Sequence, residues 1–119
     1  MRKNRTVFLA VILAVSAFLT AACGTETETR KEVEDCRSRT GMTPVAYMDS
    51  LGLFRHGGGL FHGVHMDDGD FEIIKKRGLY VVTNPASNLK LASGIAPVKR
   101  YMDKGIPLAI GTDGAASNN

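Results

Sequence analysis

Asp113 is the residue best placed for chemistry in this sequence, because it follows an apolar run and stands in Gly-Thr-Asp-Gly. A carboxylate at the end of a buried strand is costly unless it is paired, hydrogen-bonded or bound to a cation. The flanking Gly111 and Gly114 would let backbone or a ligand come close. The alternative is an ordinary aspartate in a glycine turn, and the residues alone favour that alternative.

His62 and His65 form a second candidate, with two residues between them. Neighbours at this spacing point to opposite faces of a regular strand, so at most one of them faces a ligand. The alternative for either is a histidine that is hydrogen-bonded within the scaffold. His56 lies in a glycine-rich stretch, and we assign it no role.

The segment 84–94, Asn-Pro-Ala-Ser-Asn-Leu-Lys-Leu-Ala-Ser-Gly, is expected to be a polar loop that is neither helix nor strand. Asn84, Ser87 and Asn88 offer donors and acceptors beside a pocket, and we predict that they bind substrate. Alternatively, these side chains cap their own turns, as Asn and Ser commonly do.

Strands and helices are expected to alternate in the second half of the chain. The periodicity predicts strands at 59–65, 79–83 and 106–112, with helices at 66–78 and 95–105 between them, after two helices at 29–41 and 43–52. This alternation is typical of parallel βαβ units in an α/β fold. Ligands gather at the carboxyl ends of such strands, where His62, Asn84 and Asp113 lie.

The N-terminus predicts export. Arg2, Lys3 and Arg5 precede an uncharged run at 7–22, which is the pattern of a signal peptide over residues 1–22. Ala22 followed by Cys23 resembles a bacterial lipoprotein cleavage site, so we predict lipidation of Cys23, with plain cleavage or an uncleaved anchor as alternatives. An extracytoplasmic, membrane-attached protein is then expected, with a polar linker at 23–29 and a folded domain at 30–119.

The charge balance argues against a nucleic-acid partner. The chain has 15 Lys and Arg against 12 Asp and Glu, and three of the cations lie in the predicted signal peptide. The remainder is balanced, whereas a domain that binds nucleic acid carries a basic surface.

The segments 29–54, 84–98 and 111–119 closely resemble the amidohydrolase superfamily. They are most similar to the branch that contains 5-methylthioadenosine/S-adenosylhomocysteine deaminases and triazine chlorohydrolases, and the likeness runs from about Glu28 to Asn119. The resemblance implies a (β/α)₈ barrel that uses a divalent metal, zinc or iron, to activate a water. That water displaces an amine or chloride from an aromatic ring, and the deaminases act on aminopurine nucleosides in the cytoplasm.

By this resemblance, three residues are expected to be catalytic. Asp113 matches the metal ligand on the eighth strand, which also shuttles the proton of the attacking water. His62 matches a histidine on the sixth strand that holds the water or the substrate, and His65 matches the histidine that follows it. Glu28 matches the glutamate that protonates the ring nitrogen.

The chain also departs from the family pattern. Thr25 stands where the metal-binding histidine of the fifth strand is expected, and the His-x-His pair of the first strand has no counterpart. We therefore expect a fragment that is inactive alone, with metal occupancy in doubt, and with a non-catalytic lipid-anchored binding protein as the alternative. Assembly with a second fragment is a third hypothesis.

Length supports a partial barrel. A complete barrel takes about 250 residues, so this chain of 119 residues is expected to form strands six to eight without closing. Open strand edges at 60–65 and 107–112 would then favour self-association.

Overall fold

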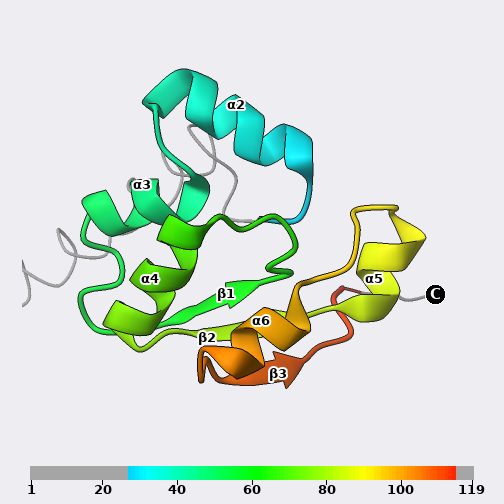
Figure 1. The fold of residues 1–119 in the computed structure, drawn as a ribbon. Coiled ribbons are helices and arrows are strands. Elements are labelled where there is room, and N and C mark those ends of the chain that lie inside the picture. Colours follow the sequence, from blue (N-terminus) through cyan, green and yellow to red (C-terminus); the bar gives the residue numbers. More distant parts are fainter. Residues whose placement is uncertain (1–26, 115–119) are drawn as a thin grey trace, which may run out of the picture.

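The computed structural model describes residues 27–114 (Figure 1). The predicted signal peptide at 1–22, lipidation at Cys23 and the first part of the predicted linker lie outside these residues. Within 27–114, no helix is both long enough and apolar enough to span a membrane.

A three-stranded parallel sheet confirms the expected α/β architecture. Its strands are β1 (Gly59–Phe61), β2 (Tyr80–Thr83) and β3 (Leu108–Ile110), in the order β1-β2-β3. Leu60 pairs with Val81, which pairs in turn with Leu108. Because the sheet is open on both sides within the described residues, it corresponds to part of a barrel.

Within residues 27–114, five helices accompany the sheet, and most of them begin and end near the capping residues that the sequence provides. They are α2 (Arg30–Thr40), α3 (Pro44–Ser50), α4 (Asp68–Arg77), α5 (Pro85–Lys90) and α6 (Val98–Asp103). Thr29 caps α2 in a reciprocal capping box with Glu32, and Gly41 ends the helix in the left-handed region. The predicted helices at 29–41, 43–52 and 66–78 are thus confirmed, with slightly shorter bounds.

The expected loop at 84–94 is wrong in its first half, because Pro85–Lys90 form α5. Pro85 occupies the first helical position, where its missing N–H costs nothing and its fixed φ favours the helix. The backbone N–H of Asn88 donates to the carbonyl of Asn84, and that of Leu91 donates to Ser87. A helix of six residues is too short to show the repeating apolar pattern by which helices are predicted.

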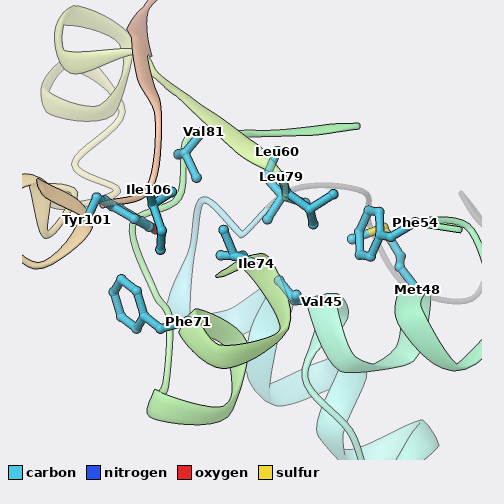
Figure 2. Close-up of a cluster of buried hydrophobic side chains, with 10 residues drawn as sticks. All are labelled: Val45, Met48, Phe54, Leu60, Phe71, Ile74, Leu79, Val81, Tyr101 and Ile106. Atoms are coloured by element: carbon cyan, nitrogen blue, oxygen red, sulfur yellow. The ribbon is translucent and has the colours of Figure 1, made fainter. Parts of the chain in front are cut away.

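The core lies on one face of the sheet (Figure 2). Leu60 and Val81 point from the strands to this face, where Phe71 and Ile74 of α4 meet them. Residues one step along each strand point the opposite way. Phe61 and Tyr80 are accordingly exposed, so the second face of the sheet is open within the described residues. The other core members are Val45, Met48, Phe54, Leu79, Tyr101 and Ile106.

The packed region begins before the predicted domain boundary at residue 30. Thr27 and Glu28 are buried. The carbonyl of Thr27 accepts hydrogen bonds from the backbone N–H groups of Val64 and His65, at 3.1 and 3.2 Å. These contacts tie the last part of the predicted linker to the segment that follows β1.

Asp70 joins α3 to α4. Its carboxylate is buried and accepts hydrogen bonds from the Thr43 hydroxyl, which caps α3, and from the backbone N–H of Asp67 at 3.0 Å. The Asp67 carboxylate in turn accepts from the backbone N–H of Asp70. One carboxylate therefore fixes the starts of two helices that pack against each other.

We expect Asp70→Ala to lower the free energy of unfolding by about 2 to 3 kcal/mol, because two donors lose their acceptor and one of them is buried. The matched control is Asp68→Ala in the same helix turn. The Asp68 side chain is 91% exposed and forms a surface ion pair with Arg100, so its loss should cost less than about 1 kcal/mol. Urea denaturation of both variants measures the difference, and equal costs would contradict this role for Asp70.

Asp70 should also make stability depend on pH. Burial raises the pKa of its carboxyl above the ordinary range, against the opposing effects of its hydrogen bonds. The folded state therefore binds this proton more tightly than the unfolded state does. The resulting stabilisation is present below about pH 4 and is lost as the pH rises through the folded-state pKa. Denaturation at a series of pH values should show this loss in the parent chain and not in Asp70→Asn; identical profiles would refute it.

Candidate active site

The candidate site lies at the carboxyl ends of the three strands. The backbone N–H of His62 donates to the carbonyl of Val82, and that of Gly111 donates to the carbonyl of Thr83, both at 2.9 Å. These bonds continue the parallel pairing just beyond the strands. They bring the segments that follow β1, β2 and β3 to the same edge of the sheet.

The three predicted catalytic residues meet at this edge. His62 Nε2 lies 3.7 Å from Glu28 Oε2 and 3.7 Å from Asp113 Oδ2. Glu28 and His62 are buried, and the Asp113 side chain keeps 30% of its surface exposed. Two carboxylates and an imidazole from distant parts of the chain thus converge, with one carboxylate open to solvent.

Left-handed backbone is concentrated at this site. Among residues 27–114, the non-glycine residues with positive φ are His62, Ala92 and Asp113. Such a conformation costs about 1 to 2 kcal/mol per residue and persists only where the surroundings enforce it. Because the chain turns at His62, the alternation of a regular strand does not extend from His62 to His65.

The predicted substrate-binding residues contact the catalytic side chains. Ser87 Oγ donates to Asp113 Oδ2 at 2.6 Å. Asn88 Oδ1 lies 2.8 Å from His62 Nδ1, and Asn84 Nδ2 lies 3.5 Å from the same nitrogen. All three are buried, so in this structure their polar groups support His62 and Asp113.

Ser93 is a site residue that the sequence did not reveal. Its hydroxyl donates to Glu28 Oε1 at 2.7 Å, and its carbonyl oxygen lies 2.9 Å from His65 Nε2. Ser93 follows the left-handed Ala92, which turns the chain toward Glu28. Serine before glycine is a common turn pattern, and it gives no signal for a partner so far away in the sequence.

Tyr101 holds the backbone immediately after His62. Its hydroxyl donates to the carbonyl of Gly63 at 2.7 Å. Burial raises the pKa of Tyr101 far above its usual range, so the hydroxyl keeps its proton. Gly63 itself has φ 58°, and a Cβ there would stand 2.8 Å from Tyr101 Oη and from Val81 Cγ1. Only glycine fits between these two side chains.

The donor set falls short of a metal site. Within residues 27–114, no group of three or more His, Cys, Asp and Glu side chains is arranged to hold a metal ion. Zinc sites use three or four protein ligands, whereas here His65 is turned to the Ser93 carbonyl and His56 is exposed. The described residues therefore do not form a metal site by themselves.

Comparison with known proteins identifies the family. The model of the amidohydrolase family matches residues 11–119. The chain belongs to the amidohydrolase family. Among curated relatives of this amidohydrolase chain, the 5-methylthioadenosine/S-adenosylhomocysteine deaminase of Natronomonas pharaonis is 48% identical over 92 residues. That match covers 77% of the chain and 21% of the relative, so the chain spans about a fifth of the relative's length.

Solved amidohydrolase-like structures agree with the fold. An adenosine deaminase from Xanthomonas campestris with bound zinc matches 79% of the chain and 21% of its own length, with 41% identity and a TM-score of 0.72. An atrazine chlorohydrolase from Arthrobacter aurescens complexed with zinc matches 72% of the chain and 19% of its own length, with 27% identity and a TM-score of 0.64. The resemblance to this branch and the partial-barrel fold are thus confirmed.

Gly63→Ala should disturb the site through packing, and Gly78→Ala is its matched control. Both glycines are left-handed, but a Cβ on Gly78 would meet no atom within 4 Å. We expect Gly78→Ala to cost about 1 kcal/mol from backbone strain and Gly63→Ala about 1 to 3 kcal/mol more from overpacking. Thermal or urea denaturation measures both, and equal losses would show that the contact with Tyr101 and Val81 imposes no constraint.

Proposed function

We propose that this chain carries the Glu28, His62 and Asp113 part of a hydrolytic deaminase site. The main support is that these three side chains converge at the carboxyl ends of parallel strands. One oxygen of each carboxylate lies 3.7 Å from Nε2 of the imidazole. The similarity to 5-methylthioadenosine/S-adenosylhomocysteine deaminases, at 48 to 49% identity, supports this reaction class. The substrate we propose is an aminopurine nucleoside of that type.

The geometry supports a division of roles between the two carboxyl groups. Hydrolytic deamination adds water to the ring carbon that bears the amine, transfers a proton to a ring nitrogen and expels ammonia. Glu28 is buried, and the Ser93 hydroxyl holds its Oε1 in place. This contact positions a carboxyl group that we propose delivers a proton to the ring nitrogen. Asp113 is partly open to solvent and suits the group that accepts a proton from the attacking water and then returns it to the departing amine, which leaves as ammonia. The proton of the added hydroxyl group returns to Glu28 as the ring carbonyl forms. His62 stands between Glu28 and Asp113 and orients the attacking water.

We further propose that this chain alone has no catalytic activity. The family resemblance and the zinc-bound neighbours imply a divalent metal, zinc in the first place and iron as the alternative. Of the described residues, Asp113 is the one that the resemblance implies as a ligand. Because residues 27–114 provide too few ligands for such an ion, we propose that a second polypeptide segment supplies the others.

We also propose a membrane-attached location and self-association. Lipidation at Cys23 would place the domain outside the cytoplasm on a membrane surface. Pairing through the free edges of β1 and β3 would allow self-association. A non-catalytic, lipid-anchored binding protein is the alternative to an enzyme, and it would use the same site without chemical turnover.

A chimera tests the proposed reaction. Residues 28–119 of this chain would replace the matching segment of the Dictyoglomus thermophilum deaminase, which is 49% identical over 92 residues. We expect zinc-dependent ammonia release from methylthioadenosine or S-adenosylhomocysteine. Glu28→Gln and Asp113→Ala should each reduce the rate by about 100-fold or more, while Asp103→Ala, an exposed residue paired with Lys99, should leave it unchanged.

Each outcome decides one part of the proposal. Full activity of a folded Asp113→Ala chimera would refute the assigned role of Asp113. A folded chimera without any activity would favour the non-catalytic alternative. Ammonia release by the unmodified 119-residue chain with zinc would show that the chain needs no second segment.

A further inference from the structure

His62 Nδ1 has two amide neighbours that make opposite demands on it. Asn88 presents an amide oxygen at 2.8 Å, and Asn84 presents an amide nitrogen at 3.5 Å. An amide oxygen only accepts a hydrogen bond and an amide NH₂ only donates one, whereas a neutral ring nitrogen does one or the other. Nδ1 therefore carries a hydrogen if Asn88 is its partner and a lone pair if Asn84 is.

The two distances decide between these partners. A separation of 2.8 Å is that of a full hydrogen bond, while 3.5 Å is beyond the normal range for N–H donors. We propose that Asn88 is a positioning residue that holds His62 in the Nδ1–H tautomer, so that the lone pair of Nε2 faces Glu28 and Asp113. The tautomer of a histidine is commonly set in this way by the partner of its other nitrogen.

The distances around Nε2 do not require a hydrogen on that nitrogen. An Nε2–H group directed at two carboxylates would form a charge-assisted hydrogen bond of about 2.7 to 2.9 Å. Both carboxylate oxygens instead stand 3.7 Å away, which is too far for a shared hydrogen. In the Nδ1–H tautomer, Nε2 and the two carboxylate oxygens are all acceptors, and a water bound beside them would donate its two hydrogens to two of the three.

The contact with His62 uses the amide oxygen of Asn88 and leaves the amide nitrogen without a partner among the described residues. Asn88 is 2% exposed, so its Nδ2 is a buried donor. A buried unpaired donor is costly. Asn88 is therefore poorly explained as a residue that stabilises the fold alone, and well explained as the acceptor for His62.

The catalytic meaning of this tautomer rests on the proposed function. With its lone pair on Nε2, His62 accepts a hydrogen from the attacking water and leaves the oxygen lone pair free to attack. In the other tautomer Nε2 would donate to the water and to the carboxylates, and it could not orient the attack in this way. The tautomer itself is measured without turnover, so its test can fail or succeed apart from the deaminase proposal.

His65 provides an internal reference. Its Nε2 lies 2.9 Å from the carbonyl oxygen of Ser93. A carbonyl oxygen only accepts, so His65 is fixed as the Nε2–H tautomer, opposite to His62. The third histidine of the chain, His56, is exposed. The parent chain should therefore show two histidines of opposite tautomer.

Nitrogen-15 NMR of the imidazole rings tests the proposal on the purified full-length chain, at a pH where the rings are neutral. The nitrogen that carries a hydrogen and the nitrogen that carries a lone pair resonate far apart, and a His62→Gln spectrum assigns the His62 signals. We expect the Nδ1–H pattern for His62 and the Nε2–H pattern for His65. A His62 signal of the Nε2–H type would overturn the proposal at once.

Three variants test the role of Asn88. Asn88→Leu keeps roughly the size of the side chain and removes the acceptor, so the tautomer ratio of His62 should move toward Nε2–H by about tenfold. Asn88→Asp keeps an acceptor and should retain Nδ1–H, as should the matched control Asn84→Ala. Retention of Nδ1–H in a folded Asn88→Leu chain would overturn the role of Asn88, and so would its loss in Asn88→Asp if the leucine variant fails to fold.

Discussion

Parallel pairing of β2 with both of its neighbours is the constraint on which the rest of this structure depends. Because the strands run in the same direction, the segments that follow β1, β2 and β3 all emerge at one edge of the sheet. His62, Asn84 and Asp113 are thereby brought together from positions far apart in the sequence. Core residues of α3, α4 and α6 form one cluster with residues of β1 and β2 on one face of the sheet. This packing keeps the strand ends in position.

A buried polar cluster at that edge is stable only if its groups are paired. Ser93 pairs with Glu28, Ser87 with Asp113 and Asn88 with His62. The left-handed backbone at His62, Ala92 and Asp113 adds strain in the same region. Local rules of sequence are broken most often at functional sites, because the constellation needed for chemistry differs from the one that folding favours. The concentration of strain and buried polarity at one edge is therefore consistent with a site.

Much of this fold could be predicted from residues whose effects are local. Thr29 and Gly41 mark the ends of α2, Thr43 with Pro44 starts α3, and the order of apolar runs indicates a parallel sheet. The helix α5 was not predictable in the same way, because a helix of six residues that begins with a proline is too short to show a repeating apolar pattern. The partners of Ser93 and Asn88 could not be found either, since they depend on how distant segments meet. The roles expected for Glu28, His62 and Asp113 came from resemblance, and the structure adds that these residues are neighbours.

The chain belongs to the amidohydrolase family and spans about a fifth of the relatives it matches. Its central feature is the convergence of Glu28 and Asp113 on His62. A crystal structure of the full-length chain measures this most directly. We predict both carboxylates within about 4 Å of the imidazole, with Ser93 hydrogen-bonded to Glu28 and Ser87 hydrogen-bonded to Asp113. An Asp113 side chain turned away into solvent, or Glu28 separated from His62, would contradict this prediction.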